Sequence, residues 1–194
     1  MKIGLFGGSF NPAHEGHLHV AETAMRRMNL DWVWWLVARG NPLKESHGSF
    51  DERLASAARL AQHPRMIISD IETRLGVNYT RDLLRHLKNR APSAHFVWIM
   101  GADNLTGFHR WGGWQEIAEQ VPICVIARPG AGPSARLSRF ATTFSPARHD
   151  SSSATRLPLA HPPAWAYLTA PWHQASSTAL RRSASARNPF GTVS

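Results

Sequence analysis

Cysteine is nearly absent from this chain of 194 residues, and long apolar runs are absent altogether. The single cysteine, Cys124, excludes an internal disulfide, and its place in the apolar stretch VPICVIARP indicates a buried structural thiol rather than a nucleophile. Because no run reaches about eighteen apolar residues, we expect no transmembrane helix. The first apolar run is interrupted by Gly7, Gly8 and Ser9, so we expect no signal peptide. These absences favour a cytoplasmic protein without a membrane partner.

Acidic residues are also scarce, since 13 Asp and Glu stand against 22 Lys and Arg and the formal net charge is +9. The imbalance is greatest in residues 131–194, which hold seven arginines and one acidic residue, Asp150. A basic segment can bind nucleic acid, bind a small polyphosphate, or simply form a soluble surface. Because aromatic residues are not interleaved with the basic ones, nucleic acid is not the favoured partner.

Apolar runs alternate with helical patterns along most of the chain, and hydrophobic residues make up 43% of it. Strands are predicted over residues 2–7, 31–39, 65–72, 94–103, 122–130 and 164–171. Helices are predicted over residues 14–28, 50–62, 79–91, 112–120 and 176–184. In the second of these helices, the apolar face is predicted to hold Leu54, Ala58 and Ala61. The alternation predicts the α/β class, with a doubly wound, Rossmann-like parallel sheet and right-handed crossovers.

Residues 1–194 are expected to form a single domain. Within it, residues 131–163 are rich in Gly, Pro, Ser and Ala and show weak periodicity. That composition predicts a mobile loop region with one short helix, rather than a second core.

The stretch GGSFNPAHEGH, residues 7–17, joins the first predicted strand to the first helix. In parallel α/β sheets ligands bind beyond the carboxyl ends of the strands, where Gly7 and Gly8 lie. Glycine lets a backbone approach a ligand closely and adopt conformations that other residues avoid. The helix start offers free N–H groups and a positive dipole end, and His14 and His17 share one of its faces. The turn is therefore suited to bind a phosphate chain, with histidines as donors.

Two other interpretations of this turn stay open. A glycine turn between a strand and a helix is common, and single histidines are often ordinary surface or core residues. His-x-x-His can also bind zinc, although no cysteine or carboxylate set completes such a site in the sequence. The turn matches neither the dinucleotide fingerprint G-x-G-x-x-G nor a Walker loop.

Two motifs in the sequence resemble those of one superfamily. GGSFNPAHEGH (7–17) resembles the G-x-F-x-P-x-H-x-G-H signature of nucleotidyltransferases with an H-x-G-H motif. SSTALR (176–181) resembles their second signature, I-S-S-T-x-x-R, although Ala175 stands where the pattern has isoleucine. Further stretches lie between them in an order that resembles the bacterial nicotinate-nucleotide adenylyltransferases: NPLK (41–44), YTRDLL (79–84), MGADNLTGFHRWGGWQEI (100–117) and VIARPG (125–130). The resemblance covers nearly the whole chain except residues 131–163.

The resemblance implies a nucleotidyltransferase fold and a specific reaction. The adenylyl group of ATP would pass to nicotinate mononucleotide, giving deamido-NAD and pyrophosphate. Mg²⁺, bound mainly through ATP phosphates rather than through protein ligands, is the implied cofactor. ATP and nicotinate mononucleotide are the implied partners, without nucleic acid or membrane, and the oligomeric state is left open.

The resemblance also implies roles for individual residues around ATP. It assigns His17 to the α-phosphate, where negative charge develops, and His14 to the phosphates beside it. Lys44 and Arg181 complete the implied catalytic set, although Lys44 could equally be an ordinary surface lysine. The residues implied in ATP binding are Gly7, Gly8, Ser9, Phe10, His14, His17, Gly101, Asp103, Ser176, Ser177, Thr178 and Arg181; the last serines and threonine would also suit a simple helix N-cap.

The middle motifs are implied in recognising the mononucleotide. Trp111 offers a surface on which nicotinate could stack, and Thr80 offers a donor to its carboxylate. Asp103 could accept from ribose hydroxyls. A hydrophobic anchor at Trp111 and a helix cap at Asp103 are the alternatives. The residues implied in acceptor binding are Asn41, Lys44, Tyr79, Thr80, Asp103, Trp111 and Arg128.

Two further functions are kept as alternatives. Within enzymes, the acceptor could be nicotinamide mononucleotide or another phosphate compound such as phosphopantetheine, against which the middle motifs argue. In another class, the chain could be a basic nucleic-acid-binding protein, but it has little room for an RNA-binding region.

Overall fold

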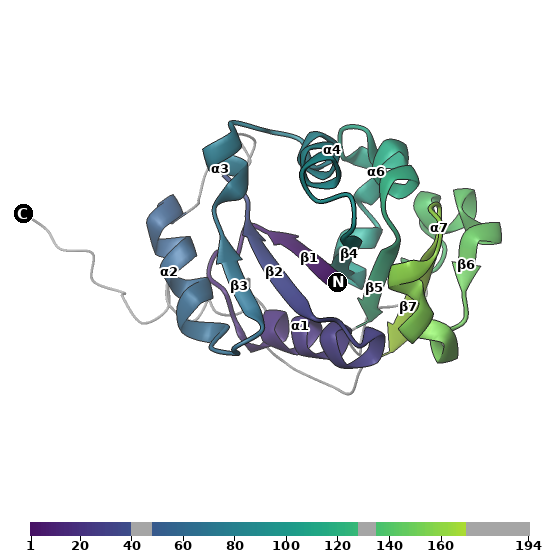
Figure 1. Cartoon of the computed structure of the whole chain (residues 1–194), viewed down its shortest axis with the longest axis horizontal. Coiled ribbons are helices and arrows are strands. Elements are labelled where there is room, and N and C mark those ends of the chain that lie inside the picture. Colours follow the sequence, from purple (N-terminus) through teal and green to yellow (C-terminus); the bar gives the residue numbers. More distant parts are fainter. Residues whose placement is uncertain (40–47, 128–134, 170–194) are drawn as a thin grey trace, which may run out of the picture.

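The sheet at the centre of the molecule is parallel throughout. The computed structural model describes residues 1–39, 48–127 and 135–169. Its strands are β1 (Lys2–Gly8), β2 (Trp32–Val37), β3 (Met66–Ser69), β4 (His95–Gly101), β5 (Ile123–Ala127), β6 (Arg148–His149) and β7 (Trp165–Thr169). They lie in the order β3-β2-β1-β4-β5-β7-β6, and each neighbouring pair is parallel (Figure 1). The predicted doubly wound α/β fold is therefore confirmed.

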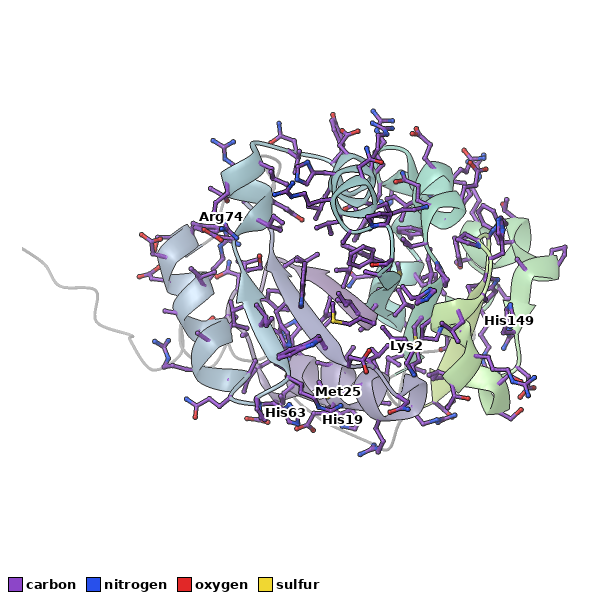
Figure 2. The ribbon with its side chains drawn as sticks, in the orientation of Figure 1. Lys2, His19, Met25, His63, Arg74 and His149 are labelled. Carbon is purple, nitrogen blue, oxygen red and sulfur yellow. The ribbon has the colours of Figure 1, made fainter. Side chains whose placement is uncertain are left out.

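Helices cover both faces of the sheet. The α-helices are α1 (Glu15–Met28), α2 (Phe50–Leu60), α3 (Ile71–Leu75), α4 (Thr80–Arg90), α5 (Ala102–Leu105), α6 (Trp114–Gln120) and α7 (Arg139–Thr143). Among the described residues, the 3-10 helices are η1 (Phe108–Arg110), η3 (Ser145–Ala147) and η4 (Ser151–Leu159). Arg74 on α3 and His149 on β6 lie toward opposite ends of the molecule (Figure 2).

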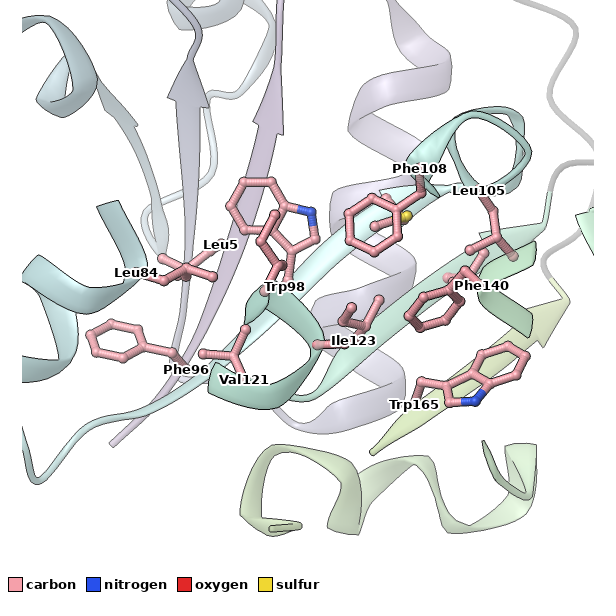
Figure 3. Packing of buried hydrophobic residues seen from close by; sticks show 14 of the residues in the cluster. Leu5, Leu84, Phe96, Trp98, Leu105, Phe108, Val121, Ile123, Phe140 and Trp165 are labelled. Carbon is pink, nitrogen blue, oxygen red and sulfur yellow. The ribbon is translucent and has the colours of Figure 1, made fainter. Parts of the chain in front are cut away.

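Strand periodicity divides the core into two clusters. In β4, Val97 and Ile99 belong to the cluster under α1, α2 and η4, whereas Trp98 and Met100 belong to the cluster under α4 to α7. Successive side chains of a strand point to opposite faces, so a strand buried on both sides is apolar without interruption. Figure 3 shows the cluster under α4 to α7, whose labelled rings include those of Trp98, Phe108 and Phe140.

Two predicted strands end earlier than the sequence indicated. The run over residues 65–72 was expected to be one strand, but β3 ends at Ser69 and α3 begins two residues later. The Ser69 hydroxyl accepts a hydrogen bond from the Ile71 N–H at 3.3 Å, which favours the turn into that helix. Similarly, β4 ends at Gly101 and the residues that follow form α5. Short helices of four or five residues leave little periodicity to detect.

The segment over residues 131–163 contains more regular structure than expected. Its described part, residues 135–163, includes the one short helix that was predicted, α7, together with η3, β6 and the nine-residue η4. Phe140 is buried in one core cluster and Leu157 in the other. The single domain and the mobility of this segment stay predictions. The helix predicted over residues 176–184 lies outside the described residues.

Candidate active site

The centre of the sheet contains a switch point. β1 and β4 are neighbours, and their last registered pair is Phe6 with Ile99. Gly8 and Gly101 each follow that pair by two residues, so they lie at the same carboxyl edge. The connections after the two strands lead to opposite faces, since α1 packs on one cluster and α5 on the other. Such a point is where ligands bind in open α/β sheets.

The turn after β1 has a strained residue at its middle. Phe10 has a φ of 45°, in the left-handed region that a large side chain seldom adopts. Its ring is 1% exposed and packs edge-on against Phe6 and His17, with centroid distances of 5.4 and 5.1 Å. Strain of this kind persists only where the surroundings fix it, and it is frequent at functional sites.

His14 and His17 form a capping box at the start of α1. The Nδ1 atom of His14 accepts from the Gly16 N–H at 3.0 Å, and Nδ1 of His17 accepts from the His14 N–H at 3.2 Å. The two rings lie 3.8 Å apart between centroids. Because each Nδ1 is an acceptor, the ring proton of a neutral imidazole belongs on Nε2. The cap therefore fixes both the tautomer and the orientation of two donors at the helix N-terminus.

The glycines of the turn lie close against aromatic rings. A Cβ on Gly7 would lie 2.5 Å from the ring of Trp98, and one on Gly8 would lie 3.1 Å from the ring of Phe10. Neither glycine has a positive φ; the positive-φ glycines among the described residues are Gly76 and Gly113. The expected conformational reason for this pair is therefore wrong, and close packing of aromatic rings is the observed reason.

Helix α2 contributes two residues that the sequence did not reveal. Arg53 is 3% exposed and Ala57 is fully buried, whereas Ala58 is exposed and Leu54 is only partly buried. The predicted apolar face is thus confirmed at Leu54, which packs against the core, and at Ala61, and it is wrong at Ala58. A hydropathy pattern cannot find a buried arginine, and no other signal marked it.

The Arg53 guanidinium is surrounded by backbone carbonyls. Nη1 donates to the oxygens of Ser9 at 2.9 Å and Ala38 at 2.7 Å, Nη2 donates to Arg39 at 3.0 Å, and Nε donates to Gly48 at 3.3 Å. Burial lowers the pKa of Arg53 from its ordinary value. Four acceptors offset the desolvation of a charge that stays protonated at neutral pH.

The predicted acceptor residues Tyr79, Thr80 and Trp111 belong to elements on the face of the sheet opposite α1. Tyr79 is 52% exposed, and α4 begins at the next residue, Thr80. The Tyr79 ring lies against the backbone of Gly112, where an added Cβ would be 2.7 Å from the ring. Gly112 directly follows Trp111, so the fold brings Tyr79 close to this part of the chain. Arg81 lies over the same ring, with its Cζ 5.3 Å from the centroid.

Trp111 is partly buried and anchored by other rings. It packs edge-on against Trp98 and Phe108, with centroid distances of 6.2 and 5.2 Å. Edge-to-face contacts leave part of a ring face uncovered. The interpretation of Trp111 as a hydrophobic anchor is supported by these contacts, and stacking of a substrate on it stays a prediction.

Asp103 does not cap its helix. The N-cap of α5 is Gly101, and no side chain caps it. Asp103 lies in the first turn of α5 and is exposed, and its backbone carbonyl accepts from the Thr106 hydroxyl at 3.0 Å. The capping interpretation is therefore wrong, and a carboxylate lies exposed just beyond the carboxyl end of β4.

Seven predicted site residues lie outside the described residues. They are Asn41, Lys44, Arg128, Ser176, Ser177, Thr178 and Arg181. Their roles stay predictions.

Burial also raises the pKa of two groups outside the turn, Cys124 and Glu72. Cys124 is fully buried, which raises the pKa of its thiol to about 12, as expected for a structural thiol. Burial raises the pKa of Glu72 above its ordinary value of 4.5, against the opposing effect of a hydrogen bond from the Arg39 backbone N–H.

Within residues 1–39, 48–127 and 135–169, no group of three or more His, Cys, Asp or Glu could hold a metal ion. No helix in those ranges is long and apolar enough to cross a membrane.

Several known proteins similar to this chain are named nicotinate-nucleotide adenylyltransferases. Residues 5–183 match the family model described as cytidylyltransferase-like. A probable nicotinate-nucleotide adenylyltransferase of Caulobacter sp. (strain K31) is 58% identical over 183 residues, which cover 93% of this chain and 97% of that protein. Another, of Methylorubrum extorquens (strain PA1), is 52% identical over 93% of this chain and 99% of its own length.

A solved structure has the same fold. Nicotinic acid mononucleotide adenylyltransferase of Plasmodium falciparum, complexed with NaAD, superposes with a TM-score of 0.69 at 19% identity. The match covers 93% of this chain and 82% of that chain. At this identity the likeness concerns the fold alone.

Proposed function

The chain belongs to the cytidylyltransferase-like family, and we infer that it transfers the adenylyl group of ATP to nicotinate mononucleotide, forming deamido-NAD and pyrophosphate in NAD biosynthesis. Relatives named probable nicotinate-nucleotide adenylyltransferase match 93% of the chain. The family model matches residues 5–183, which include β7 and the turn over residues 7–17, called the histidine turn below. Nicotinamide mononucleotide as acceptor and a nucleic-acid-binding role gain no support from any feature of the described residues.

The reaction calls for positioned charge rather than for an enzyme nucleophile. The 5′-phosphate of the mononucleotide attacks the α-phosphorus of ATP, the new P–O bond forms, and the bond to pyrophosphate breaks. Negative charge develops on the oxygens of the α-phosphate. Donors that already point at that position lower the barrier most, because they need no reorganisation during the reaction.

The capping box of His14 and His17 is the observation that carries the chemical part of the proposal. Its two Nδ1 acceptors hold each imidazole with Nε2 as the protonated nitrogen. The helix N-terminus adds its own N–H groups and positive dipole end. We assign Nε2–H of His17 to the α-phosphate and His14 to the adjacent phosphates. Gly7, Gly8, Ser9 and Phe10 complete this side of the ATP site as backbone contacts.

Mg²⁺ belongs to the proposal as a companion of ATP. It prefers oxygen ligands and usually keeps several waters, taking its other ligands from phosphates and one or two carboxylates. The histidine turn supplies nitrogen donors, which suit phosphate oxygens rather than Mg²⁺, and the turn after β4 presents the exposed carboxylate of Asp103. When bound, the ion offsets negative charge on the leaving pyrophosphate.

The acceptor side is proposed to lie along α4, α5 and Trp111. Thr80 would donate to the nicotinate carboxylate, Asp103 would accept from ribose hydroxyls, and Trp111 would present its uncovered ring face. Gly101, Tyr79 and the residues outside the described ranges, Lys44 and Arg181 among them, keep their predicted roles. A cytoplasmic location and the lack of nucleic-acid and membrane partners stay part of the proposal.

A pyrophosphate-release assay tests the function directly. The purified chain is incubated with ATP, Mg²⁺ and nicotinate mononucleotide, and the product is identified by mass as deamido-NAD. Parallel reactions contain nicotinamide mononucleotide, phosphopantetheine or no acceptor. Release with nicotinate mononucleotide well above the other reactions supports the proposal. Equal release with all acceptors, or none with any, contradicts it.

A further inference from the structure

Two side chains of helix α2, those of Arg53 and Ser56, form hydrogen bonds with the histidine turn. Arg53 donates to the Ser9 carbonyl at 2.9 Å, just before the strained Phe10. Ser56, one helical turn later, accepts from the Ala13 N–H at 3.2 Å, just before the N-cap His14. The two contacts therefore hold both ends of the strained part of the turn.

The same arginine also fixes the backbone beyond β2. Its other donors go to the carbonyls of Ala38, Arg39 and Gly48, so one planar group ties three separate stretches of backbone together. A guanidinium presents its N–H groups in a fixed fork, which a lysine ammonium cannot reproduce. Arg53 is thus suited to set relative positions and not merely to fill space.

We propose that Arg53 is a positioning residue for phosphoryl chemistry in this site, acting through the Ser9 carbonyl on the turn that carries His14 and His17. The path is short: Arg53 holds Ser9, the next residue is Phe10, and the Phe10 ring contacts the His17 ring at 5.1 Å. This proposal rests on the proposed function for its catalytic consequence. The effect of Arg53 on the conformation of the turn can be measured whether or not the proposed function is right.

The kinetic test uses Arg53→Lys, which keeps the charge and loses the fork. Displacement of reacting groups by about 1 Å can cost about 100-fold in rate. We expect kcat to fall about 10- to 100-fold, while KM for nicotinate mononucleotide changes less than about twofold, because the described acceptor residues Thr80, Asp103 and Trp111 lie on other elements. Arg59→Lys is the matched control, since Arg59 is exposed on the same helix, and its kcat should equal that of the wild type.

Amide hydrogen exchange provides a readout that does not depend on activity. In Arg53→Lys, the amides of Ala13, His14 and Gly16, which are bonded to side chains in the folded turn, should exchange faster, and in Arg59→Lys they should not. Ser56→Ala, which removes the contacts of the hydroxyl with the Ala13 N–H at 3.2 Å and the Phe10 carbonyl at 3.5 Å, should speed exchange at His14 and Gly16 less than Arg53→Lys does. It replaces Arg53→Lys if that variant does not fold.

The possible outcomes separate positioning from plain stability. A fall in kcat at unchanged KM, with faster exchange in the turn, supports the proposal. A lowered Tm with normal kcat per folded molecule, or unchanged exchange in the turn, overturns it. If the wild type shows no adenylyl transfer at all, the proposed function fails, and the exchange measurement alone decides whether Arg53 holds the turn.

Discussion

The two turns that meet at the switch point are built in opposite ways. The turn after β1 leads into α1, a helix of 14 residues whose cap is made by His14 and His17. The turn after β4 leads into α5, a helix of four residues whose N-cap is Gly101 and which has no side-chain cap. The first turn is also held by Arg53, whereas the second exposes Asp103.

This contrast suggests that the turn after β1 serves the chemical step and that the turn after β4 serves acceptor recognition. Charge develops at one place during adenylyl transfer, and rigid donors act best on it. A turn fastened by side-chain hydrogen bonds provides such donors. Groups that recognise an acceptor must first be accessible to it, and the proposed acceptor residues Asp103 and Tyr79 are exposed. The predictions below test whether chemistry and acceptor choice are separate in this sense.

Replacing His17 should have the largest effect. Loss of one preorganised donor typically lowers kcat by about 10²–10³. His17→Ala also leaves the His14 N–H without its cap acceptor, which should cost about 1 kcal/mol, or a few degrees in Tm. His17→Gln restores that acceptor, because glutamine at this position completes a capping box. We therefore expect Tm to recover in His17→Gln and kcat to stay low.

The control for His17 is His95→Ala. His95 is exposed at the start of β4, at the amino edge of the sheet, and its replacement should leave kcat unchanged. A histidine that is only structural predicts the reverse for His17: a lowered Tm with near-normal turnover of the folded protein. Kinetics and thermal unfolding on the same preparations distinguish the two cases.

Trp111→Ala should have a smaller effect, confined to the acceptor. Stacking on an aromatic side chain contributes about 1–3 kcal/mol, so kcat/KM for the mononucleotide should fall roughly 5- to 150-fold, while ATP affinity persists. Trp114→Ala is the control, because Trp114 packs in the same ring cluster against Phe108 and Phe140. It should lower Tm without a selective loss of mononucleotide use. If ATP affinity falls equally in Trp111→Ala, this tryptophan is a packing residue.

Cleavage by protease should occur first within residues 131–163, if that stretch is the most mobile part. Local opening determines where limited proteolysis begins. Brief digestion and mass analysis of the fragments locate the first cut. A first cut within α4 instead would contradict the expected mobility of this stretch.

The smallest effect is expected at Glu72. Burial raises the pKa of this carboxyl, so the folded state binds the proton more tightly and ionisation costs stability. Stability is therefore lost as pH rises from about 4.5 toward neutrality. Glu72→Gln keeps an oxygen acceptor for the Arg39 N–H and removes the charge. Its Tm should exceed that of the wild type slightly at pH 7 and approach it at pH 4, and a lower Tm at pH 7 would disprove the reasoning.

Much of the fold could be predicted because the buried strands are short uninterrupted apolar runs and the longer helices have a clear period. The parallel order also follows from the alternation of strands and helices. α3 and α5 were missed because four or five residues contain barely one helical period. Arg53 was missed because its burial depends on four carbonyls that come together only in the folded chain.

The site was predictable where a motif is local and less so where it depends on packing. His14 and His17 are three residues apart, so their shared helix face follows from the spacing. Their reciprocal cap does not, since it depends on the conformation of the turn. The space required at Gly7 is set by Trp98, which lies more than ninety residues away in the sequence.

Acceptor selectivity of variants at His17, at the turn after β1, and at Thr80, at the start of α4, tests most directly whether chemistry and acceptor choice are separate. The quantity is the ratio of kcat/KM for nicotinate mononucleotide to that for nicotinamide mononucleotide. A mismatched polar contact costs about 1–3 kcal/mol, so the wild-type ratio should be roughly 10 to 100. His17→Ala should lower both values and keep the ratio, whereas Thr80→Val should reduce the ratio toward 1. A wild-type ratio near 1, or a ratio that collapses in His17→Ala, would contradict the account.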